Sequence, residues 1–518
     1  MYPHKQCAVF LLCAQVVLCQ GKNVLFLVSD DMRPEIGAYL GSDFPSPVHP
    51  TIHTPNLDAL ASRSLLLKRA YVQQAICSPS RTSLLTGRRP DTTHVYDLIH
   101  YFRDVGGNYT TIPQFFKNNG YRSIGMGKVF HHGKASGHDD PVSWSEPYYH
   151  APNEKYRSNI VTWRAVAEAE YDIRPLPDMQ IADYAIKSLR RVAPGAKSGK
   201  QNFFVAVGFH KPHLPFVFPE HYLDLYPKNK ISLPDNPYAP VSMPEVAWIN
   251  YIKQEMGNYH DIKILRPSGN INTTLPDDLV LDLRRAYYSA VSYVDDLVGK
   301  VLNELEALGL SHNTIVSFWG DHGWQLGEHG EWCKHTNFED ATHAPMMVRV
   351  PGITDEGLVT EGLIDFVDLF PTLVEAAGFK PLSLCPEDST KIALCREGNS
   401  FMPLMHDPAR EWKSAAFSQY PRMNYTVMGY TMRTDEHRYT EWPEFIGEPH
   451  YKPNWKKLHG VELYDHSVDP EENFNRADDP DYKILRAQLS TKLRRGWRYS
   501  QPKETISVTV KGSCALYP

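Results

Sequence analysis

The sequence predicts an α/β protein in which helices cover both faces of a mixed, mainly parallel β-sheet, followed by a smaller α+β domain built on an antiparallel sheet. Short apolar runs alternate with segments of helical periodicity up to about residue 380, a pattern typical of parallel sheets. Beyond that point the apolar runs are shorter and alternate with polar residues, which favours an antiparallel sheet. A chain of 518 residues is also too long for one ordinary core.

Three apolar runs in the first part are predicted as strands, at residues 24–28, 203–207 and 314–319. Helical spacing of apolar residues predicts helices at residues 56–67, 111–119, 177–191 and 276–308. Each predicted strand ends in a polar cluster, namely Ser29-Asp30-Asp31, His210-Lys211-Pro212-His213 and Asp321-His322-Gly323. Because sites in parallel sheets form beyond the carboxyl ends of the strands, these clusters are expected to converge on one pocket.

The C-terminal part is predicted to hold strands at residues 415–420, 427–434, 438–442 and 461–464 and a helix at 482–495. We expect a signal peptide at residues 1–20, a large α/β domain at 21–380, an α+β domain at 381–500 and a disordered tail at 501–518. The signal peptide is inferred from a weakly basic start and an apolar stretch, residues 7–19, that is too short to span a membrane.

Cysteines and Asn-X-Ser/Thr sequences agree with a secretory route. Three sequences are candidate glycosylation sites: Asn108, Asn272 and Asn424. Cys385 and Cys395 lie close together in a Pro-containing loop and are expected to form a disulfide in an oxidising compartment, with two free thiols as the alternative. The pairing of Cys333 and Cys514 is left open.

The charge distribution excludes an obvious nucleic-acid-binding class. The formal charge is −6, the pI is near 6.4, and lysines and arginines are spread along the chain rather than gathered in blocks. No segment after the predicted signal peptide approaches the length and apolarity of a membrane span. If the substrate is an anion, local cations must hold it.

Asp30 and Asp31 are candidate metal ligands. Two adjacent carboxylates at the end of a strand repel each other, and a divalent cation commonly keeps both ionised. Oxygen ligands favour calcium or magnesium, and Asp321 with His322, also at a strand end, could complete the site. The alternative is a solvated loop or a helix-capping aspartate.

Cys77 precedes Pro79, which suits the first turn of a helix over residues 80–86. The positive end of that helix would face an anion at this position. A thiolate is nevertheless a poor ligand for a cation that prefers oxygen, and an oxygen-bearing derivative of Cys77 would remove the conflict. The alternative is a buried cysteine that acts as a small apolar side chain.

The run Cys77-Ser78-Pro79-Ser80-Arg81, continued by Thr86-Gly87-Arg88, resembles the signature of the type I sulfatases. The resemblance extends to the residues around Asp30, Lys128, His210, Asp321, Lys334 and Glu462, and so spans nearly the whole mature chain. It implies an alkaline-phosphatase-like fold. In this family the cysteine is oxidised to formylglycine by a dedicated formylglycine-generating enzyme.

The resemblance also implies a mechanism and a role for each matched residue. Hydrated formylglycine at Cys77 would attack sulfur in line, form a covalent sulfate intermediate and then expel sulfate. One calcium ion would be held by the following residues: Asp30, Asp31, Cys77, Asp321 and His322. Arg81 and Lys128 would hold the nucleophile and stabilise the developing charge, and His131 would help to deprotonate the nucleophile. His210 and Lys334 would contact the sulfate and help to protonate the leaving oxygen. Trp324 would line the sugar pocket.

The motifs are most similar to those of family members that remove the 2-O-sulfate from terminal iduronate in heparan and dermatan sulfates. This similarity implies a glycosaminoglycan substrate and a lysosomal or exported protein, with no nucleic-acid or membrane partner. Three alternatives stay open: a sulfatase for another sulfated sugar, a phosphodiesterase or phosphonate hydrolase of the same superfamily, and a non-catalytic glycan-binding protein.

Overall fold

The computed structural model describes residues 21–40, 51–151 and 161–502. The predicted signal peptide and all but two residues of the predicted tail, residues 503–518, lie outside the described part. Among the described residues, no helix is long and apolar enough to cross a membrane.

The centre of the molecule is a seven-stranded sheet with the order β11-β2-β10-β7-β1-β5-β3. Its strands are β1 (Asn23–Asp30), β2 (Leu65–Tyr71), β3 (Arg122–Gly127), β5 (Phe203–Pro212), β7 (Thr314–Gly320), β10 (Met346–Arg349) and β11 (Leu358–Asp365). Only β10 runs antiparallel to its neighbours. The prediction of a mixed, mainly parallel sheet is confirmed, and the three predicted strands are its adjacent central members β7, β1 and β5.

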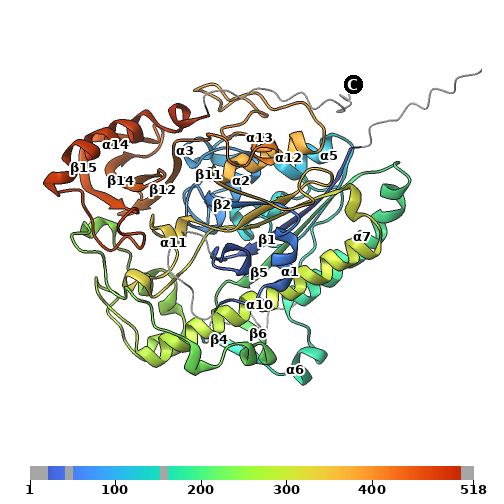
Figure 1. Cartoon of the computed structure of the whole chain (residues 1–518), viewed down its shortest axis with the longest axis horizontal. Helices are drawn as coiled ribbons and strands as arrows, with labels where there is room; N and C mark the ends of the chain where they lie inside the picture. Colours follow the sequence, from blue (N-terminus) through green and yellow to red (C-terminus); the bar gives the residue numbers. More distant parts are fainter. Residues whose placement is uncertain (1–20, 41–50, 152–160, 503–518) are drawn as a thin grey trace, which may run out of the picture.

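The alternation of side chains along β1 shows why both faces of the sheet carry helices. Leu25 and Leu27 pack into one core with helices α1, α7 and α10. Val24, Phe26 and Val28 point to the other face and pack with α2, α5 and α12. Figure 1 shows the two helical layers on opposite sides of the sheet. Because both faces of the strand are buried, the strand reads as one continuous apolar run.

The long helices agree with the predictions apart from two boundaries: the helix predicted at residues 177–191 continues to Lys197, and the helix predicted at residues 56–67 ends early. The longer helices are α1 (Pro55–Ala61), α2 (Cys77–Thr86), α5 (Ile112–Asn118), α7 (Pro177–Lys197), α10 (Asp277–Ala307), α12 (Leu369–Ala376) and α14 (Lys483–Arg495). The helix predicted at residues 56–67 was wrong beyond residue 61, because its last three leucines begin strand β2. Three consecutive apolar residues fit a buried strand as well as a helix.

Shorter elements occupy the connections. The short helices are α3 (Pro90–Thr93), α4 (Phe102–Val105), α6 (Glu168–Ile173), α8 (Tyr251–Gln254), α9 (His260–Lys263), α11 (Glu339–Thr342) and α13 (Met402–His406). Two small sheets pair β4 (Trp163–Val166) with β6 (Phe216–Pro219) and β8 (Gln325–Leu326) with β9 (Trp332–Cys333).

The C-terminal part contains a four-stranded antiparallel sheet in the order β12-β13-β14-β15. Its strands are β12 (Ala416–Arg422), β13 (Val427–Arg433), β14 (His437–Ile446) and β15 (Lys452–Asp465). Helix α14 packs on one face of this sheet through Leu489 and Leu493, as Figure 1 shows beside the larger sheet. The predicted α+β architecture of this region is confirmed.

The cysteines and glycosylation sequences can also be placed. Cys385 and Cys395 form the expected disulfide, with Cα atoms 5.0 Å apart. Cys333 is a buried free thiol, and Cys514 lies outside the described residues. All three candidate glycosylation sites are exposed: Asn108, Asn272 and Asn424. Glycosylation itself stays a prediction.

Candidate active site

The carboxyl ends of β1 and β7 bring two acidic clusters together, as the sequence predicted. β1 ends at Asp30 and β7 ends directly before Asp321, with Ser29 paired to Gly320 in the sheet. The chain turns at Asp31, which has a left-handed φ of 61°. The backbone N–H of Asp31 then donates a hydrogen bond to Oδ1 of Asp321 at 2.9 Å. A backbone turn of this kind, held by a side chain, fixes the two carboxylates relative to each other.

Cys77 enters the same cluster from helix α2, of which it is the first residue. Its Sγ atom lies 3.5 Å from Nε2 of His322 and 4.0 Å from Oδ1 of Asp31. Nε2 of His322 lies 3.3 Å from the same oxygen of Asp31. Two overlapping groups of possible ligand atoms, each within 4.8 Å of one another, contain Asp30, Asp31, Cys77, Asp321, His322 and, in addition, His213. The structure therefore brings all five predicted metal ligands together.

The chemistry of these side chains fits a hard divalent cation. Burial raises the pKa of Asp31 well above its usual value, and the neighbouring carboxylates Asp30 and Asp321 raise it further. A bound cation would offset this cost and keep the cluster ionised. Burial also lowers the pKa of His322 to about 4, so the ring is neutral near neutral pH. Its Nδ1 lies 2.9 Å from the carbonyl oxygen of Gly323, which leaves Nε2 for a metal.

The sulfur of Cys77 is the member of the cluster that fits least well. Burial raises the pKa of the Cys77 thiol well above its usual value, and the charge of Asp30 raises it further. The residue is therefore a neutral thiol, which is neither a strong nucleophile nor a ligand that a hard cation prefers. An oxygen-bearing side chain at this position would satisfy both requirements.

Three buried cations surround the carboxylates. Arg81 donates from Nη2 to Oδ1 of Asp30 at 2.9 Å and from Nε to Oδ2 of Asp321 at 2.8 Å. Lys128 forms an ion pair with Asp30 and lies 3.5 Å from the sulfur of Cys77. Burial alone would favour the neutral acid, but Lys128 and then Arg81 hold the pKa of Asp30 well below its usual value. This carboxylate is thus ionised in the folded protein.

Lys334 is the third cation and contacts the other aspartate of the pair. Its Nζ lies 3.1 and 3.0 Å from the two carboxylate oxygens of Asp31 and 4.8 Å from the ring centre of Trp324. Trp324 is fully buried behind this lysine. It also packs edge-on against Phe216. The tryptophan therefore supports Lys334, and its predicted contact with a sugar stays a prediction.

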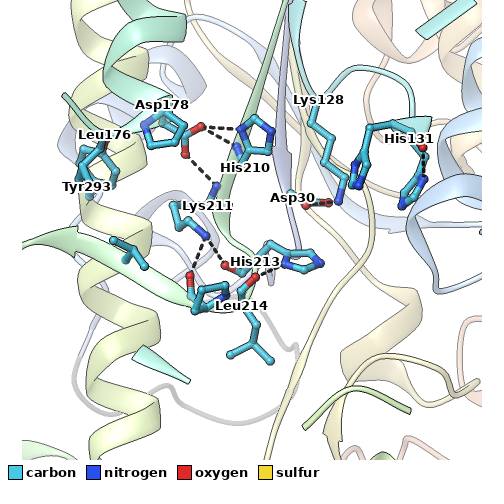
Figure 2. A pocket seen from close by; sticks show the side chains of 14 residues that line it. Asp30, Lys128, His131, Leu176, Asp178, His210, Lys211, His213, Leu214 and Tyr293 are labelled. Atoms are coloured by element: carbon cyan, nitrogen blue, oxygen red, sulfur yellow. Dashed lines mark hydrogen bonds and ion pairs between the residues drawn. The ribbon is translucent and has the colours of Figure 1, made fainter. Parts of the chain in front are cut away.

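A cavity of about 310 Å³ opens beside Asp30 and Lys128. His131 and His210, both predicted site residues, lie in its wall, as Figure 2 shows. Burial lowers the pKa of His131 to about 2, and the charge of Lys128 contributes, so this ring is neutral near neutral pH. The opposite wall is apolar and comes from Leu176, Pro177, Leu214, Pro215, Val217 and Tyr293. The cavity thus joins a charged end to an apolar end.

Two charged residues of the site were missed by the sequence analysis. Glu255, which follows helix α8, lies 3.2 Å from Nζ of Lys334 and 3.6 Å from Nε2 of His213. Asp178, in the first turn of α7, contacts His210. Neither stands in a recognisable motif, and both were placed by the fold. His213 belongs to the polar cluster at the end of β5 that the sequence analysis expected at the pocket, although no role was predicted for it.

Comparisons with known proteins agree with this geometry. A family model described as Sulfatase matches residues 22–379, and one described as N-sulphoglucosamine sulphohydrolase, C-terminal, matches residues 327–498. The chain is similar to iduronate 2-sulfatase of Mus musculus, with 39% identity over 519 positions that cover 88% of this chain and 91% of the relative.

Two solved structures share the fold. A phosphonate monoester hydrolase from Silicibacter pomeroyi has a TM-score of 0.68 and 21% identity, covering 94% of this chain and 97% of its own. A protein solved with its substrate D-glucosamine-2-N,6-O-disulfate has a TM-score of 0.66 and 20% identity, covering 92% and 97%. The alkaline-phosphatase-like fold that the sequence resemblance implied is confirmed.

Proposed function

Because the chain belongs to the sulfatase family, we propose that it removes the 2-O-sulfate from terminal iduronate residues of heparan and dermatan sulfates. The observation that carries the proposal is the cluster around Cys77, in which three carboxylates, a neutral imidazole and three cations meet at the end of the sheet. The 39% identity to a mouse iduronate 2-sulfatase supports the substrate.

Cys77 is the proposed site of conversion to formylglycine by a formylglycine-generating enzyme. The converted side chain, when hydrated, supplies an oxygen nucleophile and an oxygen ligand where the thiol offers neither. Helix α2 begins at this residue, so the positive end of a ten-residue helix faces the position where a sulfate would bind. Lys128, 3.5 Å from the sulfur, would stabilise negative charge at the same place.

The residues that would hold a calcium ion are Asp30, Asp31, Asp321 and His322, together with the converted Cys77. Arg81 orients two of these ligands, since it bridges Asp30 and Asp321. The chain itself supplies the fixed charges that position the sulfate, and burial of the carboxylates strengthens their interactions with these charges.

Proton transfers are assigned to the histidines of the cavity wall and to Lys334. His131 is neutral and would accept a proton at the nucleophile, while His210, which lines the same cavity, would give one to the leaving oxygen. Lys334 would contact the sulfate from the side of Asp31. The apolar wall formed with Leu214 and Val217 would pack against the carbon face of the sugar.

An acidic compartment suits this proposal, and we place the enzyme in the lysosome, reached through the secretory pathway. The buried disulfide Cys385–Cys395 and the exposed glycosylation sequences support an oxidising route of synthesis.

The assay that tests the function compares three substrates with one enzyme preparation. A disaccharide with a 2-sulfated terminal iduronate should be hydrolysed at least tenfold faster than one with 6-sulfated glucosamine. A phosphonate monoester forms the third arm, because a phosphonate hydrolase shares the fold. Equal rates on the two sugars would end the iduronate assignment, and preferential hydrolysis of the phosphonate would end the sulfatase assignment.

A further inference from the structure

Asp178 is a buried carboxylate whose partners all belong to the segment that carries His210. The residue lies in the first turn of α7 and is 2% exposed. Its Oδ1 accepts the backbone N–H of His210 at 2.8 Å, and its Oδ2 accepts the backbone N–H of Lys211 at 2.9 Å. The same Oδ1 lies 3.0 Å from Nδ1 of the His210 ring. Figure 2 shows these contacts converging from the helix onto the strand.

The ammonium group of Lys211 feels the charge of Asp178, which raises its pKa against the effect of burial, but its hydrogen bonds go to other groups. Nζ of Lys211 donates to the carbonyl oxygens of His213 and Pro215 at 2.6 and 2.7 Å, and so fastens the connection between β5 and β6. A buried carboxylate usually needs several hydrogen-bond donors or a cation close by. Here two backbone amides and one imidazole are the donors, so the ring of His210 is part of what stabilises Asp178.

The contact with Nδ1 fixes the protonation state of the ring. An ionised carboxylate only accepts hydrogen bonds, so Nδ1 must carry a hydrogen to pair with Oδ1 of Asp178. The remaining nitrogen, Nε2, is then left for the cavity that His210 lines together with Asp30 and Lys128. With its backbone and its ring both held by one side chain, His210 has little freedom to turn.

We propose that Asp178 is a positioning residue that sets the tautomer and orientation of His210, so that Nε2 faces the leaving oxygen of the substrate. The inference rests on the proposed sulfatase function and gives His210 a fixed direction for its proton. In the step itself, the oxygen nucleophile bonds to sulfur as the bond from sulfur to the leaving oxygen breaks, and the electron pair of that bond stays on the leaving oxygen. This oxygen takes the proton from Nε2 of a His210 ring that carries hydrogen on both nitrogens, which leaves the ring neutral with its hydrogen on Nδ1. Asp178 keeps its charge throughout and stabilises the ring while the proton is on it.

A double-mutant cycle separates this role from a purely structural one. The variants are Asp178→Asn, His210→Ala and the double variant, each compared with the parent enzyme on the 2-sulfated iduronate disaccharide. Asp178→Asn should lower kcat by about 10- to 100-fold, the size usual for the loss of a partner that orients a catalytic histidine, with a small change in KM. In the His210→Ala background the same change should lower kcat by less than about threefold, because the residue that it positions is gone.

A matched control lies on the same helix. Asp183→Asn removes an exposed carboxylate of α7 and should leave kcat unchanged. The melting temperatures of all variants show whether a loss of rate comes from a loss of folding. The proposal would be overturned if Asp178→Asn lowered kcat by the same factor in the parent and in the His210→Ala background. It would also be overturned if kcat of Asp178→Asn equalled that of the parent.

A measurement that does not depend on activity tests the role of Asp178 separately from the proposed sulfatase function. Long-range proton–nitrogen NMR on histidine-labelled parent protein, with the His210 signals assigned by their loss in His210→Gln, reports which ring nitrogen carries hydrogen. We expect the hydrogen on Nδ1. A ring protonated on Nε2 alone would overturn the inference even in a fully active enzyme, whereas hydrogen on Nδ1 in a protein without sulfatase activity would reject the function and not the contact.

Discussion

The sulfur of Cys77 lies 3.5 Å from Nε2 of His322, and both side chains are buried within a cluster of carboxylates. Burial raises the pKa of the Cys77 thiol, so an unmodified cysteine at this position holds its proton and reacts poorly. A side chain that bears oxygen would instead face the positive end of α2 and the cation of Lys128. The proposed function therefore depends on the oxidation state of Cys77.

Conversion of Cys77 is the first prediction. Mass analysis of the peptide that contains Cys77, from protein secreted by a cell with the converting enzyme, should show a mass lower than that of the cysteine form by the exchange of thiol for aldehyde. Cys77→Ala should lower kcat at least about 1,000-fold, since the nucleophile is lost, with little change in melting temperature. The control is Cys333→Ala, which removes the other buried free thiol and should retain activity. Full activity in a preparation that holds only cysteine would contradict the mechanism.

Metal dependence is the second prediction. Removal of divalent cations by a chelator should abolish activity, and calcium should restore it, because Asp31 and its neighbours need a cation to stay ionised together. Calcium should also stabilise the fold by about 2.7 kcal/mol at a concentration 100 times its dissociation constant. Thermal melting with and without calcium measures this effect. Asp321→Asn should weaken the stabilisation by calcium. If no divalent cation changes the melting temperature of the parent, the metal site is contradicted.

Arg81 provides the third prediction, because it is the fully buried bridge between Asp30 and Asp321. Arg81→Ala would leave two carboxylates without their partner in the protein interior. Breaking a buried ion pair in this way costs about 3–5 kcal/mol, which chemical denaturation can measure. Arg63→Ala is the control, since Arg63 pairs with Glu306 at the surface and should change stability by less than about 1 kcal/mol. If the two substitutions lowered the free energy of unfolding equally, the bridge formed by Arg81 would contribute no more to stability than a surface ion pair.

The fold and the centre of the site could be predicted because their signals are local. Strands β1, β5 and β7 are continuous apolar runs, and each ends in polar residues that the parallel arrangement brings to one edge of the sheet. Arg81 and Lys128 match the sulfatase motifs, and in the folded chain both form ion pairs with Asp30. The spacing of these residues in the sequence does not by itself predict these ion pairs.

The parts that escaped prediction depend on tertiary contacts. Strand β10 runs against the parallel direction, and nothing in the four residues Met346–Arg349 specifies this direction. Glu255 follows a single turn of helix, and only the folded chain brings it to Lys334, which is 79 positions away. Asp178 looks like an ordinary acidic residue at a helix start until its contact with His210 is seen.

Stability against pH is the last prediction, and it concerns two buried acids where the C-terminal sheet meets the larger part of the molecule. Burial raises the pKa of Glu331 to about 8 and that of Glu462 to about 7. Arg422 faces both carboxyls and opposes these shifts, while Glu462 adds to the rise at Glu331. Glu472 adds to the rise at Glu462, whose carboxyl accepts hydrogen bonds from Trp442 and Tyr464.

The sign of the effect follows from proton binding. In the unfolded chain these acids release their protons near pH 4.5, whereas the folded protein keeps them up to about pH 7–8. At these two sites the folded state therefore binds more protons across this range, and their contribution to stability is full below about pH 4.5 and is lost as the pH rises towards 8. Glu331→Gln and Glu462→Gln should each remove part of this fall, because a neutral amide replaces a group that must otherwise ionise. Denaturation at pH 5 and pH 8 should show variants close to the parent at pH 5 and more stable than it at pH 8. Glu436→Gln, at an exposed position beside the same sheet, should show no such difference. Glutamine variants at positions 331 and 462 that gain no stability over the parent between pH 5 and pH 8 would contradict the assignment.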